Sequence, residues 1–106
     1  MKKISKVILT SAFVSLLMAP STFAVDGKSL YTAKVCHTCH GAEGKKPIMP
    51  IYPKLAGQSE EYLFNQMKDI KSGKRANGMA EFMKGIIANV SDSDFKAISK
   101  YLSGLK

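Results

Sequence analysis

The stretch Cys36-His37-Thr38-Cys39-His40 decides how the rest of the chain is interpreted. Two thiols three positions apart on one helical turn can each add to a vinyl group of the same porphyrin, and the histidine that follows is then held under the iron. This spacing predicts thioether attachment of a haem at Cys36 and Cys39, with the imidazole of His40 as the proximal ligand. His37 lies inside the motif, too close in sequence to bind the same iron.

Two other chemistries use the same residue types. A C-x-x-C pair in an exported chain is also typical of a disulfide, which is redox-active in thioredoxin-like proteins. A zinc site needs four ligands, and the two Cys and two His of this chain lie within five positions. A thioredoxin-like fold needs β-branched strand runs in β-α-β units, and the sequence has no such pattern. The residues therefore favour haem attachment over both alternatives.

Residues 1–24 have the features of a secretory signal peptide. Lysines come first, the run Val7–Ala19 is mainly apolar, and small residues precede a cleavage point after Ala24. A retained membrane anchor is the alternative, but the apolar run is short for a bilayer span. We therefore expect a single domain over residues 25–106, exported to the periplasm, with no stable membrane insertion.

The net charge of the exported domain indicates which kind of macromolecule it binds. The chain has 16 Lys and Arg residues against 8 Asp and Glu residues. Three lysines belong to the leader, so the exported domain keeps 13 basic and 8 acidic residues, a net charge of +5. An exported domain does not meet cytoplasmic nucleic acid, so we expect no nucleic-acid partner. A basic surface suits transient docking to acidic redox proteins, because charge raises the encounter rate.

Helical spacing recurs in three segments, and no segment alternates as a strand does, so the sequence predicts an all-α fold. Asp26, Ser59 and Ser91 are the expected N-cap residues, and Gly73 is the expected stop of the second helix. We expect the first helix to continue through Val35 and deliver the two cysteines. The apolar positions are Leu30, Tyr31 and Val35, then Leu63, Met67 and Ile70, then Phe95, Ile98, Tyr101, Leu102 and Leu105.

The loop between the first two helices, Gly41–Gln58, is rich in glycine and proline and is predicted to be extended and stiff. On the proximal side of a haem, a proline carbonyl in this loop would accept a hydrogen bond from the His40 ring. Such a bond orients the imidazole and raises its basicity. Pro50 is the first choice for this carbonyl and Pro53 is the second.

The segment Gly73–Gly85 is irregular at its start and carries the candidates for the distal side of the haem. Either Met79 or Met83 can supply a thioether as the sixth iron ligand. A His/Met pair raises the reduction potential relative to two nitrogen ligands, which suits an electron carrier. Arg75 is a candidate partner for a haem propionate.

Together these residues resemble a bacterial class I cytochrome c of the short soluble mono-haem type, and most of all a single domain of the di-haem branch. The resemblance is carried by Cys36–Gly41, Pro53–Gln58, Tyr62, Met83 with Gly85, Val90–Asp94 and Tyr101–Leu102. The chain departs from the pattern at Val90, where Leu or Phe is usual, and in having a single haem motif.

The resemblance implies the cytochrome c fold, with three to five short helices around one covalently bound haem. It implies that the N- and C-terminal helices cross at a small residue, Gly27 or Ala33, against Tyr101. In this family the distal methionine lies a fixed distance before the last helix, and that register implies Met83 rather than Met79.

The implied function is one-electron transport in a respiratory chain, without enzymatic activity. Its partners would be a membrane oxidase, reductase or dehydrogenase that docks transiently. A haem peroxidase or ligand sensor with an open sixth position is one alternative, and it needs a distal acid–base pair that the sequence does not offer. A haem-free thiol-disulfide protein is the other.

Overall fold

The computed structural model describes residues 25–106, so the leader expected over residues 1–24 lies outside the described part of the chain. The helices are α1 (Gly27–Ala33), α2 (His37–His40), α3 (Glu60–Ser72), α4 (Ala80–Ile87) and α5 (Asp92–Ser103). Residues 25–106 contain no strand, which confirms the expected all-α fold. None of the helices in this range is both long and apolar enough to cross a bilayer.

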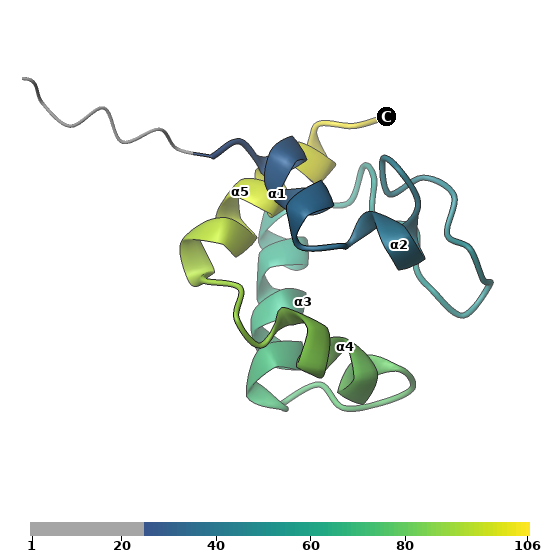
Figure 1. The fold of residues 1–106 in the computed structure, drawn as a ribbon, viewed down its shortest axis with the longest axis vertical. Helices are drawn as coiled ribbons and strands as arrows, with labels where there is room; N and C mark the ends of the chain where they lie inside the picture. The colour runs from purple at the N-terminus through teal and green to yellow at the C-terminus, as the bar shows by residue number, and fades with distance from the viewer. Residues whose placement is uncertain (1–24) are drawn as a thin grey trace, which may run out of the picture.

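Helix α5 organises the packing, because it contacts both α1 and α3, while α4 packs against α3 (Figure 1). Tyr31 of α1 and Phe95 of α5 are completely buried. The predicted apolar positions of the second and third helices lie in or against the core, which confirms their amphipathic pattern. The buried core consists of Leu30, Tyr31, Leu63, Ile70, Ala80, Ile87, Val90, Phe95, Ile98 and Leu102.

The predicted helix ends are confirmed. Side-chain oxygens of Asp26, Ser59 and Ser91 each accept a hydrogen bond from the backbone N–H three residues later, at 2.8, 3.2 and 3.2 Å. Each bond satisfies one of the N–H groups that the first turn of a helix leaves unpaired. Gly73 ends α3 with a φ of 85°, a left-handed conformation that glycine adopts without steric cost.

The first helix is shorter than predicted. It ends at Ala33, and Val35 follows with a φ of 59° and an exposed side chain, so the expected continuous helix through Val35 was wrong. A left-handed conformation at a β-branched residue costs about 1–3 kcal/mol, which only the surrounding structure can enforce. The backbone N–H of Cys36 donates to the carbonyl of Tyr31 at 3.1 Å and closes this turn. The cysteine motif therefore begins a separate short helix, α2.

Helix α4 was not predicted. It has only eight residues, and Gly85 interrupts its interior. Met79 occupies its N-cap position and makes no side-chain capping bond, so the start signal is absent as well. The helix forms because Ala80 and Ile87 pack into the core against α3. Tertiary contact here overrides weak local signals.

The terminal helices α1 and α5 cross at Gly27, which confirms one of the two expected small residues. A Cβ atom added to Gly27 would overlap the carbonyl oxygen of Ala97 and lie 2.6 Å from the Cβ atom of Tyr101. The other candidate, Ala33, is exposed. The rings of Tyr31 and Tyr101 lie beside the crossing with their centroids 6.0 Å apart.

This crossing yields a stability prediction. Replacement Gly27→Ala should lower the free energy of unfolding by about 1–3 kcal/mol, because the added methyl group meets rigid backbone. Gly85→Ala is the matched control, since a Cβ there has no neighbouring heavy atom within 4 Å. It should leave stability unchanged or raise it by up to about 1 kcal/mol. Thermal unfolding of the exported protein measures both, and equal stability of the two variants would contradict the assigned crossing.

Candidate functional site

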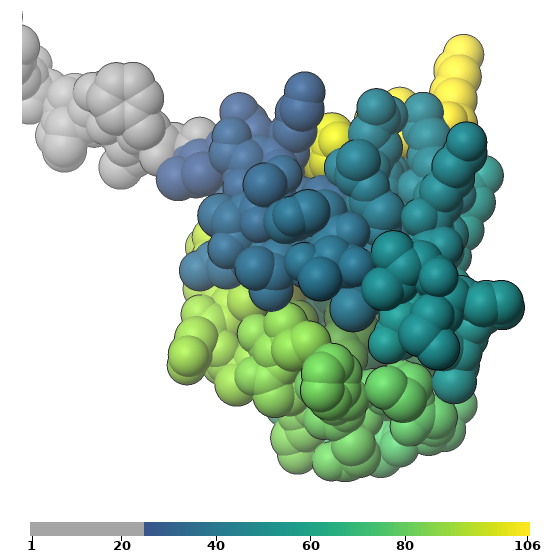
Figure 2. All heavy atoms as spheres, turned by 45° about the vertical axis from the view of Figure 1, so that its right-hand side comes forward, coloured from purple at the N-terminus to yellow at the C-terminus, as the bar shows by residue number. Residues whose placement is uncertain are grey.

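A cavity of about 250 Å³ opens among α2, the loop that follows it, and helices α3, α4 and α5. Figure 2 shows the face on which α2, this loop and α4 come together. Most of the lining side chains are apolar; among residues 25–106, Arg75 is the single lysine or arginine in the lining, and none of the lining residues is a carboxylate. A buried water molecule needs several hydrogen-bond partners, and this lining offers few, so the cavity suits a large apolar group better than solvent.

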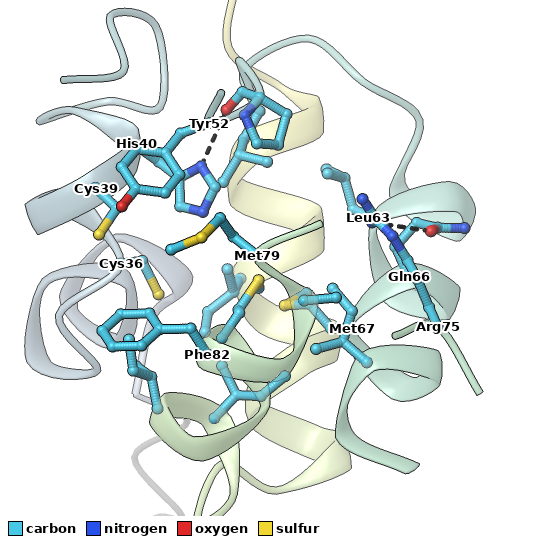
Figure 3. Close-up of a pocket in the computed structure, with 18 of the residues that line it drawn as sticks. Cys36, Cys39, His40, Tyr52, Leu63, Gln66, Met67, Arg75, Met79 and Phe82 are labelled. Atoms are coloured by element: carbon cyan, nitrogen blue, oxygen red, sulfur yellow. Dashed lines mark hydrogen bonds between the residues drawn. The ribbon is translucent and has the colours of Figure 1, made fainter. Parts of the chain in front are cut away.

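Cys36, Cys39 and His40 all line this cavity, and Figure 3 shows them on the same side of it. Both cysteines are half-buried free thiols. Burial raises the pKa of the Cys36 thiol to about 11, because a thiolate would lose its hydration there. The motif that the sequence analysis singled out is thus assembled around one apolar space.

The His40 imidazole is fixed by one hydrogen bond. Its side chain is 7 % exposed, and its Nδ1–H donates to the carbonyl oxygen of Pro53 at 3.0 Å. Burial lowers the pKa of His40, and the bond to Pro53 partly offsets this effect. The ring is therefore held neutral with its proton on Nδ1, which leaves the electron pair of Nε2 available to a metal.

The predicted first choice for this carbonyl, Pro50, was wrong, and the second choice, Pro53, is the acceptor. Pro50 and Pro53 are both exposed, so exposure does not distinguish them. Farther along, the N–H groups of Leu55 and Ala56 both donate to the carbonyl of Gly44, at 2.8 and 3.1 Å. These bonds close the loop and bring Pro53 rather than Pro50 next to His40.

The end of α2 is held from two directions. Tyr31 is completely buried, and its hydroxyl donates to the carbonyl of Gly41 at 2.7 Å. Burial raises the pKa of Tyr31 well above its usual range, so the phenol keeps the proton that it donates. The N–H of Ile48 donates to the carbonyl of Cys39 at 3.1 Å. Helix α1 and the loop thus position the motif together.

Both candidate distal methionines line the cavity. Met79 is 39 % exposed at the N-cap of α4, whereas Met83 lies one turn later, is half-buried and packs against the core. The N–H of Met83 donates to the carbonyl of Met79 at 3.1 Å, which places the two residues on successive turns. Met67 of α3 also lines the cavity and packs against the core, as predicted. The choice of Met83 over Met79 stays a prediction.

Arg75 lines the cavity too, and its Nη1 donates to Oε1 of Gln66 at 3.1 Å. Its pairing with a haem propionate stays a prediction.

Tyr52, Gln66 and Phe82 are among the cavity residues that were not predicted from the sequence. The Tyr52 ring lies 6.3 Å from the His40 ring between centroids, and no periodic pattern marks it within the proline-rich loop. Phe82 belongs to the unpredicted helix α4. Gln66 had a usable signal, because it is a polar residue three positions after Leu63 and four before Ile70, on the apolar face of α3.

These features fit a haem held by two thioethers over an imidazole, and comparison with known proteins agrees. Residues 24–106 match the sequence model of the cytochrome c family. The chain belongs to the cytochrome c family. Membership implies covalently bound haem c, and Cys36 and Cys39 are the cysteines of the attachment motif.

The relatives of this cytochrome include longer and shorter proteins. The chain is 50% identical over 74 residues to cytochrome c4 of Pseudomonas aeruginosa, which covers 70% of the chain and 35% of that protein. It is 40% identical over 68 residues to cytochrome c-554(548) of Halomonas halodenitrificans, which covers 64% of the chain and 81% of that protein. Matches to three cytochromes c4 span 35%, 37% and 43% of their lengths, so the chain resembles part of each.

The fold agrees with a solved member of the family. The crystal structure of reduced recombinant cytochrome c4 from Pseudomonas stutzeri superimposes with a TM-score of 0.62 at 35% sequence identity. The match covers 76% of this chain and 44% of that one. The expected cytochrome c fold is thereby confirmed.

The hydrogen bond from Tyr31 yields a second prediction. Replacement Tyr31→Phe should lower the free energy of unfolding by about 1 kcal/mol, because the Gly41 carbonyl loses its donor. Tyr62→Phe removes a hydroxyl from a side chain that is 53 % exposed and should leave stability unchanged. Chemical denaturation of both variants measures the difference, and an equal effect would show that the Tyr31 bond contributes nothing to stability.

Proposed function

We propose that this cytochrome is a periplasmic one-electron carrier, with haem c attached at Cys36 and Cys39 and iron ligated by His40 and Met83. The observation that carries the proposal is the buried His40 imidazole, bonded through Nδ1 to Pro53 and lining the same apolar cavity as both cysteines. The haem supplies the iron that changes between ferric and ferrous states. The protein supplies its position, its ligands and its dry surroundings.

Each protein group has a separate effect on the iron. The Pro53 carbonyl accepts the Nδ1 proton, which fixes the ring orientation of His40 and makes Nε2 a stronger donor. The apolar lining excludes water and disfavours the more highly charged ferric state, which raises the reduction potential. A thioether as the sixth ligand acts in the same direction.

Met83 is proposed as that sixth ligand because it is half-buried and packed against the core, whereas Met79 is more exposed. A ligand held by core packing keeps its position in both oxidation states, which suits fast electron transfer. With both axial positions filled by the protein, no substrate can bind iron, so we expect no enzymatic activity.

The two alternatives find less support at this site. A peroxidase needs a distal acid–base pair, and among the described lining residues no carboxylate and no histidine besides His40 is present. Redox-active C-x-x-C thiols have lowered pKa values. Burial raises the pKa of Cys36 to about 11, which argues against a redox-active thiol at this position.

The proposed partners are redox proteins that dock transiently through acidic surfaces, such as a membrane oxidase, reductase or dehydrogenase. Exposed apolar side chains from separate segments line the cavity opening, among them Val35, Ile51 and Phe82. An apolar patch at the cavity opening of a domain with net charge +5 suits transient docking to an acidic partner, because opposite charge raises the association rate. Signal cleavage after Ala24 would release the domain to the periplasm, where nucleic acid is not a partner.

Covalent attachment is tested by mass. The exported wild-type protein should exceed the mass of the polypeptide that starts at Val25 by one haem, and it should be red. The double variant Cys36→Ala with Cys39→Ala should be colourless at the bare polypeptide mass. A wild-type protein of bare polypeptide mass, with a free or oxidised thiol pair, would instead establish the thiol-disulfide alternative.

The axial ligand is tested by spectroscopy. Ferric wild-type protein should show the methionine-to-iron charge-transfer band at the red end of the visible spectrum. Met83→Ala should abolish this band, and the reduced variant should then bind carbon monoxide, whereas Met79→Ala should keep the band. If Met79→Ala alone removes it, the assignment reverses. Rapid carbon monoxide binding by wild type at neutral pH would favour the open-site alternative.

A further inference from the structure

Two sets of polar side chains lie on opposite sides of the cavity. Cys36, Cys39 and His40 lie on one side, and Gln66 and Arg75 lie on the other (Figure 3). In Figure 3 the guanidinium of Arg75 lies between the amide of Gln66 and the interior of the cavity, which is mainly apolar. A guanidinium whose direction is fixed by a neighbouring hydrogen-bond acceptor is suited to bind a carboxylate.

The backbone brings this pair together. Gly73 ends α3 in the left-handed conformation and reverses the chain, and the N–H of Arg75 then donates to the carbonyl of Asp69 at 3.0 Å. The reversal returns Arg75 alongside α3, where its Nη1 reaches Oε1 of Gln66 at 3.1 Å.

The position of the pair matches the chemistry of a porphyrin. The two vinyl groups and the two propionates of haem lie on opposite edges of the ring. A haem joined to Cys36 and Cys39 therefore presents its carboxylates on the side away from the cysteines. Arg75 and Gln66 are on that side (Figure 3).

We propose that Gln66 is a positioning residue that holds the guanidinium of Arg75 against a haem propionate and thereby raises the reduction potential of the iron. This inference rests on the proposed haem-carrier function. A propionate charge near the iron stabilises the ferric state, and a guanidinium held in contact with it offsets that charge. A mobile arginine in the same sequence position would offset less, because solvent screens it.

The test is a double-mutant cycle on the reduction potential of the exported holoprotein, measured by spectroelectrochemistry at neutral pH and fixed ionic strength. Arg75→Gln should lower the midpoint potential, and Gln66→Ala should lower it by a smaller amount. In the double variant the Gln66 substitution should have no additional effect, because it acts only through Arg75. Gln66→Leu, which keeps side-chain volume and helix propensity, should reproduce Gln66→Ala.

Asn65→Ala is the matched control, since it removes an exposed amide from the same helix and should leave the potential unchanged. An unchanged potential in the two Gln66 variants, or effects of Gln66 and Arg75 that simply add, would overturn the inference. Loss of haem from both Gln66 variants while Asn65→Ala keeps it would overturn it as well, since Gln66 would then serve the fold. Absence of covalent haem from wild type would instead refute the proposed function.

Discussion

The hydrogen bond from Nδ1 of His40 to the carbonyl of Pro53 is the contact on which the site depends. It joins α2 to the proline-rich loop and fixes the tautomer of a buried imidazole. Without an acceptor at this point, a buried ring N–H would cost about 1–3 kcal/mol. The loop is therefore more than a connection between helices, because its closure on Gly44 brings the acceptor into place.

The remaining helices follow from the need to surround an apolar space next to that imidazole. A domain of this size has a small core, and a large apolar group at its centre supplies surface for short helices to pack on. Helix α5 provides the rigid support through its crossing with α1 at Gly27 and its contact with α3. Helices α3 and α4 then contribute the methionines, Gln66 and Phe82 to the cavity.

The strained backbone conformation at Val35 also helps to position the cysteine motif. A β-branched residue adopts a left-handed conformation there so that the chain can turn from α1 into α2. The turn changes the direction of the chain after α1, and α2 then presents the cysteines and His40 to the cavity. Two hydrogen bonds hold this turn in place: the N–H of Cys36 donates to the carbonyl of Tyr31, and the hydroxyl of Tyr31 donates to the carbonyl of Gly41.

The sequence by itself determined the all-α class, the attachment motif, the three N-caps and the stop at Gly73, because each depends on residues close together in the chain. It also narrowed the His40 acceptor to a proline, but it ranked Pro50 above Pro53, since loop closure on Gly44 is a contact between distant residues. The break at Val35, helix α4, and the pairing of Gln66 with Arg75 were likewise decided by tertiary structure. In each case packing or a non-local hydrogen bond outweighs a weak or opposing local preference.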